Sequence, residues 1–271
     1  MKCPLMGSQI IETEEVLKEF CSVRGRSVKL QVEVNEDNFT FTHEADTLRP
    51  AASITKIVLC VAVEKLIAQN KIDLKNMVKV SSLLHDDFGP SVLKILNSNH
   101  ELSIPELIGL CMSSSDPDAS FFLGRLLTKG LINETLTEMG CLKTSIILGD
   151  GINTPIISGN TTASEALLIL KAGENEYNTP MTSLGLRASI LNSRIPIGVK
   201  DKGTLISHKT GTLLGVAHDV ATITCNTGML RIAFLSENQS DTLQTGYEMG
   251  ICVKRILGIF NLEVENTKSF D

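Results

Sequence analysis

A serine and a lysine, Ser53 and Lys56, stand three residues apart in the otherwise apolar stretch RPAASITKIVLCVAVEKL. Residues i and i+3 of a helix share a face, so the Lys56 amine can reach the Ser53 hydroxyl. Apolar surroundings favour the neutral amine, which makes Lys56 a plausible proton acceptor for a nucleophilic serine. Ser53 would also lie at a helix start, where free backbone N–H groups stabilise an anion. The alternative is a chance pairing of a helix start with a snorkelling lysine.

Two further short motifs follow in the sequence. SSSDPDAS places Ser115 and Asp116 on a loop between two predicted helices, and HKTGT places Lys209 at the end of a predicted strand. A second cation such as Lys209 beside Lys56 would favour the neutral amine further. Each motif alone is weak, but the three in this order point to one site rather than to chance.

The elements that must position these motifs are helices in the middle of the chain and strands toward both ends. We predict an amphipathic helix at residues 12–25 and a β-hairpin at 27–34 and 38–44. The patterns that follow predict helices at 53–69, 90–97, 104–112, 119–127, 133–139 and 162–171. After these we predict strands at 204–212, 220–228 and 230–237 and a last helix at 244–260.

This order predicts an α/β fold of the α+β type. One antiparallel sheet, formed by both termini and flanked by helices, would carry an inserted all-helical lobe. We place the helical lobe at residues 50–180 and the discontinuous α/β lobe at 1–49 and 181–271.

With these motifs in this order, the chain resembles the serine β-lactamase and penicillin-binding protein superfamily, and most closely the class A β-lactamase-like serine hydrolases. That family carries S-x-x-K, S-D-N and K-T-G, which read SITK, SDP and KTG here. The stretches SRIPIGV and KTGTLLGVAHDVATI extend the likeness over nearly the whole chain. The resemblance implies a β-lactamase/transpeptidase-like fold with its site in a cleft between the two lobes.

The resemblance also implies a role for each motif. Ser53 would be the acylated nucleophile, Lys56 its activating partner, and Ser115 a proton shuttle toward the leaving amine. The backbone N–H groups of Ser53 and Thr212 would form the oxyanion hole. Lys209 and Thr210 would hold the substrate carboxylate, and the expected substrate-binding residues are Lys209, Thr210, Gly211 and Thr212.

The chain departs from the family pattern at the second motif. Pro117 stands where the family has asparagine, and proline offers neither a polar side chain nor an N–H donor. Asp118 or Ser120 are candidates to compensate. The departure leaves the class of substrate open.

The family's deacylating glutamate is also missing from the region MGCLKTSIILGDGINTPIISGN. Counting along this region, Asp150 falls at the corresponding place, 35 residues after Ser115. Asp150 is therefore the candidate base for release of the acyl group, although GDG can equally be an ordinary turn.

Three further polar residues, Arg194, His218 and Asp219, need an assignment. Related chains often place a basic residue where this one has Ala217. Arg194 is the remaining candidate for binding a substrate carboxylate, and the alternative is that Arg194 is a surface residue. The pair His218 and Asp219 suggests a Ser-His-Asp triad, but adjacent strand residues point to opposite faces and no G-x-S-x-G motif occurs.

Composition excludes several other classes of protein. A net charge of −6 and a pI near 5.5 argue against a nucleic-acid binder. The longest uncharged apolar run, IVLCVAV, is too short to span a membrane, and the amino terminus shows no signal peptide, which predicts a soluble, cytoplasmic protein unless a leader has been removed. Seven scattered cysteines without metal-ligand spacing predict reduced thiols.

The sequence therefore predicts a serine hydrolase that forms an acyl-enzyme with a small substrate, either a β-lactam or a related amide that carries a carboxylate. No metal, organic cofactor, nucleic acid or membrane span is expected, and the oligomeric state is left open. One alternative is a same-fold D-amino-acid peptidase, esterase or biosynthetic amide hydrolase. The other is a penicillin-binding or sensor module that is acylated once and does not turn over.

Overall fold

A computed structural model describes residues 6–34, 37–85, 89–149, 157–175, 180–199 and 204–262. The chain divides into two compact units. The first contains Met1–Arg49, Thr162–Leu167 and Asn192–Asp271, and the second contains Pro50–Thr161 and Leu168–Leu191. The lobe boundaries expected from the sequence stay a prediction.

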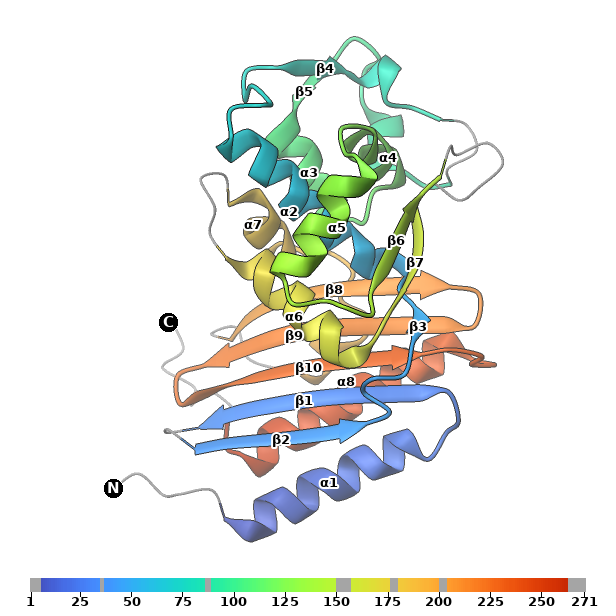
Figure 1. Cartoon of the computed structure of the whole chain (residues 1–271). Coiled ribbons are helices and arrows are strands. Elements are labelled where there is room, and N and C mark those ends of the chain that lie inside the picture. Colours follow the sequence, from blue (N-terminus) through green and yellow to red (C-terminus); the bar gives the residue numbers. More distant parts are fainter. Residues whose placement is uncertain are drawn as a thin grey trace, which may run out of the picture. The chain divides into compact units, whose positions relative to one another are not determined.

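The first unit is built on a five-stranded sheet in the order β2-β1-β10-β9-β8 (Figure 1). All neighbouring strands are antiparallel. The strands are β1 (Arg26–Val34), β2 (Asp37–His43), β8 (Leu205–Leu213), β9 (Val216–Cys225) and β10 (Gly228–Ser236). Because β1 pairs with β10, the two ends of the chain complete one sheet, and this part of the prediction is confirmed.

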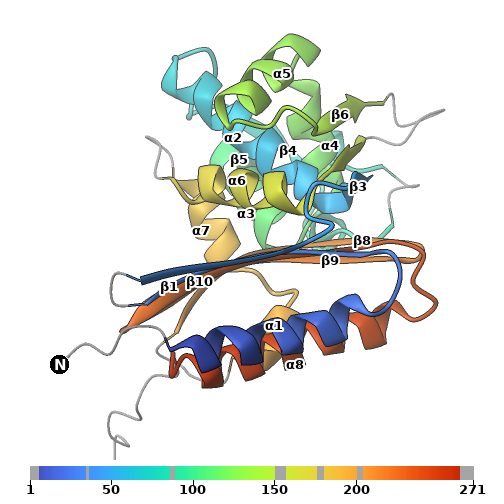
Figure 2. The ribbon, with the colours of Figure 1, turned by 60° about the horizontal axis from the view of Figure 1, so that its bottom comes forward.

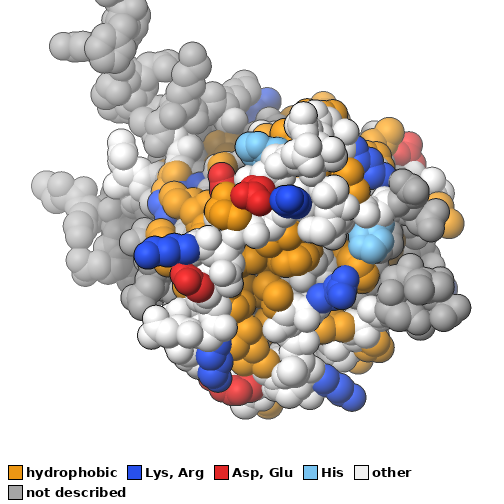
Figure 3. All heavy atoms as spheres, turned by 90° about the horizontal axis from the view of Figure 1, so that it is seen from above, with side chains coloured by type: hydrophobic (Ala, Val, Ile, Leu, Met, Phe, Trp, Pro, Cys, Tyr) orange, Lys and Arg blue, Asp and Glu red, His pale blue; other side chains and the backbone are white. Residues whose placement is uncertain are grey.

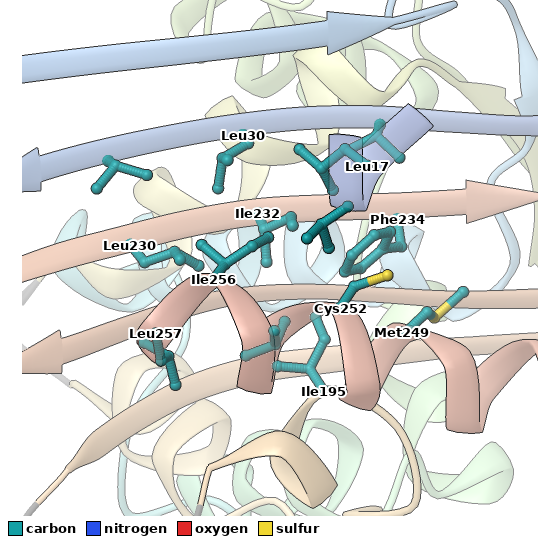
Figure 4. Close-up of a cluster of buried hydrophobic side chains, with 14 of the residues drawn as sticks. Leu17, Leu30, Ile195, Leu230, Ile232, Phe234, Met249, Cys252, Ile256 and Leu257 are labelled. Atoms are coloured by element: carbon teal, nitrogen blue, oxygen red, sulfur yellow. The ribbon is translucent and has the colours of Figure 1, made fainter. Parts of the chain in front are cut away.

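Two helices, α1 (Gly7–Cys21) and α8 (Thr242–Ile259), lie side by side on one face of this sheet (Figure 2). Asp241 caps the start of α8, because its Oδ1 accepts the backbone N–H groups of Leu243 and Gln244. Figure 4 shows apolar side chains of α8 and of the sheet facing one another. Members of this core that are at most 3% exposed include Leu17, Leu30, Ile195, Leu230, Ile232, Phe234, Met249, Ile256 and Leu257.

The second unit is mainly helical. Its central helix α2 (Thr55–Ala68) follows directly on the 3₁₀ turn η1 (Ala52–Ile54) and is apolar on nearly every side, as a helix buried in a core must be. Around it are α3 (Ile104–Ser113), α4 (Pro117–Arg125), α5 (Lys129–Glu138) and α7 (Met181–Arg187). Helix α6 (Ala163–Glu174) contributes residues to both units.

The inserted part is not all helical. It contains two antiparallel strand pairs, β4 (Met77–Lys79) with β5 (Glu101–Ser103), and β6 (Ser145–Leu148) with β7 (Ile157–Thr161). The helix expected at 90–97 is only a 3₁₀ turn, η3 (Val92–Ile95). Ser91 caps it by accepting the Leu93 N–H, and Asp116 accepts the Val92 N–H and the Ser91 hydroxyl. The remaining short elements are β3 (Arg49–Pro50), η2 (Val80–Ser82) and η4 (Ile195–Gly198).

The face that carries β4 and β5 shows a band of hydrophobic side chains with scattered charges of both signs (Figure 3). Exposed apolar residues of this unit include Leu74, Met77 and Ile95. Within the described part of the chain, no helix combines the length and the apolar character needed to cross a membrane.

Candidate functional site

Ser53 lies in η1, at the point where the chain enters α2. The preceding residue, Ala52, has a left-handed backbone with φ of +47°, which is uncommon for a residue with a side chain. The Ala51 N–H donates to the Gly159 carbonyl at 2.9 Å and anchors the turn on β7. The half-buried Ser53 is thus presented from a strained turn that its neighbours hold in place.

Lys56 lies one helical turn further along, and its side chain is 9% exposed. Its Nζ donates to the Ser115 carbonyl at 2.5 Å and to the Ser115 Oγ at 3.2 Å. Burial lowers the pKa of Lys56, while the neighbouring Cys111, Asp116 and Cys60 act in the opposite direction. Among the described residues no hydrogen bond joins Lys56 to the Ser53 hydroxyl. The structure therefore brings Lys56 together with Ser115.

Ser115 lies on the loop between α3 and α4, and its backbone is also left-handed, with φ of +59°. The next residue, Asp116, is buried and caps α4 by accepting the Ala119 N–H at 3.0 Å. The same carboxylate accepts the Ser91 hydroxyl and the Val92 N–H. Asp116 therefore ties the loop to a distant segment and holds Ser115 in its unusual conformation.

Pro117, the departure from the family motif, is the first residue of α4, where proline is well tolerated. Neither residue suggested as a substitute for the missing asparagine is available to a ligand. Asp118 is fully buried and accepts the His85 N–H at 3.0 Å, and Ser120 donates its hydroxyl to the Asp116 carbonyl.

The third motif lies on β8 in the first unit. Lys209 is 1% exposed, and its Nζ donates to the Thr210 carbonyl at 3.1 Å. Thr210 and Gly211 are buried, and Thr212 is exposed near the end of the strand.

Arg194 is a buried residue, not a surface residue, and it crosses the end of β8. Its Nη1 donates to the Gly211 carbonyl at 2.8 Å and to the His218 carbonyl, and its Nη2 donates to the Thr212 Oγ1 at 2.6 Å. Burial lowers the pKa of Arg194, and Asp219 opposes that shift. The guanidinium thus clamps the last residues of the third motif to β9.

The pair His218 and Asp219 forms no catalytic relay. Asp219 accepts from His208 Nδ1 at 3.0 Å and from the Ile195 N–H at 3.0 Å, whereas His218 Nδ1 accepts the Ser236 N–H. The second ring nitrogen of His208 lies 3.1 Å from Asn192 Oδ1. This buried network ties the segment before η4 to β8, so both residues serve the architecture of the sheet.

Asp150 lies outside the residues that the structure describes. Across the described ranges, no group of three or more His, Cys, Asp or Glu side chains is placed to hold a metal ion.

A family-level comparison matches residues 12–249 to the beta-lactamase enzyme family. The chain belongs to the beta-lactamase enzyme family. It is a serine hydrolase, and its antiparallel sheet and helices form the fold of class A β-lactamases. No curated protein matches it.

Solved structures of this family share the fold at low sequence identity. The β-lactamase from Sphaerobacter thermophilus is 23% identical, with a TM-score of 0.77 over 93% of this chain and 98% of that chain. A class A β-lactamase from Bacteroides cellulosilyticus is 17% identical, with a TM-score of 0.75 over 93% and 98%. A PBP-A variant in acyl-enzyme complex with penicillin G is 19% identical, with a TM-score of 0.74 over 96% and 98%.

One buried ionisable residue of the second unit was not singled out from the sequence. Glu64 lies in α2, two turns after Lys56, and is 1% exposed. The signal was the same one that singled out Lys56: an ionisable residue inside an apolar helical stretch.

Proposed function

We propose that Ser53 is the nucleophile of an acyl-transfer reaction and that Lys56 is its activating base. The observation that supports this most is the buried Lys56, one turn after Ser53 and 3.2 Å from the Ser115 hydroxyl. Ser53 Oγ attacks the amide carbonyl carbon, and its proton passes to the neutral Lys56 amine. Ser115 then relays a proton to the leaving nitrogen as the C–N bond breaks, which leaves an ester at Ser53.

The substrate in this proposal is a β-lactam or a related amide that carries a carboxylate. Lys209 and Thr210 bind the carboxylate, and Gly211 and Thr212 complete the strand beside it. The backbone N–H groups of Ser53 and Thr212 stabilise the tetrahedral oxyanion, a contribution worth about 3–4 kcal/mol. The Arg194 contacts support this assignment, because they fix the Gly211 carbonyl and the Thr212 hydroxyl.

Release of the acyl group is the second half of the proposed reaction. Asp150 is the proposed base that activates the hydrolytic water, with a carboxylate one methylene shorter than the family's glutamate. Asp150→Asn is expected to leave acylation unchanged and to prolong the life of the ester. An unchanged deacylation rate removes Asp150 from the mechanism.

Non-turnover penicillin binding is the second candidate function. Pro117 favours it, because the side-chain amide of the family motif is absent and Asp118 and Ser120 are bound elsewhere. The PBP-A relative was captured as an acyl-enzyme with penicillin G, which is the species such a module would accumulate.

One experiment separates these functions: incubation with a chromogenic cephalosporin and with a fluorescent penicillin, followed by measurement of intact mass. Rapid turnover supports a hydrolase, and a persistent adduct that Ser53→Ala abolishes supports a binding module. If neither turnover nor an adduct is seen, the β-lactam substrate is wrong, and D-amino-acid peptides, esters and other amides are tested next.

A further inference from the structure

Glu64 is a buried carboxyl group for which the proposed mechanism has no use. It follows Lys56 and Cys60 at four-residue spacing, so the three side chains line one face of α2. Burial raises the pKa of Glu64 to about 7, and hydrogen bonds from backbone N–H groups of α7 oppose that shift. Within the described ranges its Oε2 has no hydrogen-bond partner. Burying a polar atom without a hydrogen-bond partner lowers the stability of a core.

The contact that Glu64 makes is a helix cap supplied from a distant part of the sequence. Its Oε1 accepts the backbone N–H of Thr182 at 2.9 Å, and Thr182 is the second residue of α7. Helix α7 starts after Pro180, has no side-chain cap of its own and carries no acidic residue in its first turn. Glu64 therefore supplies what a local Asp or Ser supplies at other helix starts.

Helix α7 in turn contacts the end of α3. A Cβ added at Gly185 would lie 2.5 Å from the Met112 Cβ, so the two helices are in close contact there. Just beyond α7, the Ile190 N–H donates to the Ser113 carbonyl at 3.0 Å. Ser113 is the last residue of α3, two residues before Ser115.

These contacts form a closed circuit inside the second unit. It runs from Glu64 through α7 and Ile190 to Ser113, then through Ser115 to Lys56 and back along α2. Ser115 has a left-handed backbone, and strained conformations persist only where their surroundings hold them. The circuit is one source of that restraint.

We propose that Glu64 is a positioning residue for Ser115. By capping α7, Glu64 fixes the position of that helix against α3. Through the Ile190–Ser113 hydrogen bond, this in turn fixes the positions of the Ser115 carbonyl and hydroxyl relative to Lys56. This inference rests on the proposed function only in that Ser115 is taken to move a proton. The mechanical link itself does not depend on the substrate.

Two substitutions at Glu64 test the cap. Glu64→Gln keeps an acceptor oxygen for the Thr182 N–H, whereas Glu64→Leu fills similar space without one. Glu138→Gln is the matched control, because Glu138 pairs with Lys65 of the same helix and is exposed. The measurements are amide hydrogen exchange of residues 110–116 and 181–191, and acylation by a fluorescent penicillin at several concentrations, which separates binding from the chemical step.

For Glu64→Leu we expect at least tenfold faster exchange in both segments and at least tenfold slower acylation at an unchanged dissociation constant. Glu64→Gln and Glu138→Gln should stay within threefold of the parent protein. The inference is overturned if Glu64→Leu loosens residues 181–191 alone, or if Glu64→Gln behaves like Glu64→Leu.

A second pair of variants keeps the test valid should Glu64→Leu fail to fold. Ile190 is 66% exposed, so Ile190→Pro removes its N–H without disturbing the core, and Ile190→Ala keeps the N–H. Only the proline variant should accelerate exchange at 110–116 and slow acylation; equal behaviour of the two overturns the link. If the parent protein is not acylated, the proposed function has failed, and the exchange data still decide the link between Glu64 and Ser115.

Discussion

Backbone strain at single residues marks the helical part of the proposed site. Ala52 and Ser115 are both left-handed without being glycine. Ala52 directly precedes Ser53, and the Ser115 carbonyl accepts a hydrogen bond from Lys56 Nζ. A left-handed conformation costs a residue with a Cβ roughly 1–2 kcal/mol. One strained position therefore precedes the proposed nucleophile and the other is the proposed proton shuttle, as expected where a fold gives up stability to orient reactive groups.

Relief of this strain gives a direct prediction. Ala52→Gly removes the steric cost but adds chain entropy to the unfolded state, which offsets part of the gain. We expect the free energy of unfolding to rise by about 0.5–1 kcal/mol in urea titrations. Ala51→Gly is the matched control, because Ala51 has an ordinary right-handed backbone and is buried, so that substitution should destabilise. A loss of stability in Ala52→Gly would show that the left-handed conformation is not strained.

The ionisation of Glu64 makes stability depend on pH. Its pKa is about 7 in the folded protein against an ordinary value of 4.5, so folding favours the protonated form. Stability from this group is therefore fully present below pH 4.5 and falls as the pH rises toward 7, by about 3 kcal/mol in all. The unfolding free energy of the parent protein minus that of Glu64→Gln should decrease over this range. A difference that is flat or rises with pH contradicts the raised pKa.

At the scale of elements, Arg194 connects the segment before η4 to the two strands β8 and β9. Lysine cannot reproduce its planar set of donors, so Arg194→Lys leaves a buried acceptor among the Gly211 and His218 carbonyls unpaired. We expect a loss of about 2 kcal/mol in unfolding free energy, and a raised KM if a substrate carboxylate binds beside Thr212. Arg255→Lys is the control, because Arg255 is 48% exposed in a surface ion pair and should change stability by less than about 0.5 kcal/mol. If Arg194→Lys and Arg255→Lys lose the same unfolding free energy, Arg194 does not hold β8 and β9 together.

Elements with a strong local pattern could be predicted, and those held by distant partners could not. The hairpin of β1 and β2 and the apolar helix α2 follow from alternation and from a continuous apolar run. The seven-residue helix α7 receives a cap from Glu64, 118 positions away, and the first N–H of η3 is bound by Asp116, 24 positions away. No local pattern carries that information.

The same distinction holds for the candidate site. The order of three motifs singled out Ser53 and Lys56, and helix geometry predicted that they lie about one turn apart. Their roles stay a prediction. Spacing could not give the partner of Asp219, which is His208 and not the adjacent His218, because that choice is made by strand register. Asp150 stays a prediction.

At the scale of the whole molecule, the chain forms two compact units. Each unit contains buried cysteines, whose reactivity measures how readily that unit opens. Cys21 and Cys252 belong to the first unit, where burial raises the pKa of each thiol to about 12. The buried cysteines of the second unit are Cys60, Cys111 and Cys141. A thiol reagent can reach any of these only after the surrounding structure opens.

We therefore expect native-state labelling to follow the units. In a Cys3→Ser background, the half-buried Cys225 should react first with a maleimide, and the other cysteines should react far more slowly. Because residues that share one core open together, Cys21 and Cys252 should share one rate, and Cys60, Cys111 and Cys141 should share another. Peptide-level mass spectrometry over time reads each rate separately. If Cys60 reacts much faster than Cys111, the helical unit opens in pieces, and α2 does not belong to the same cooperative core as α3.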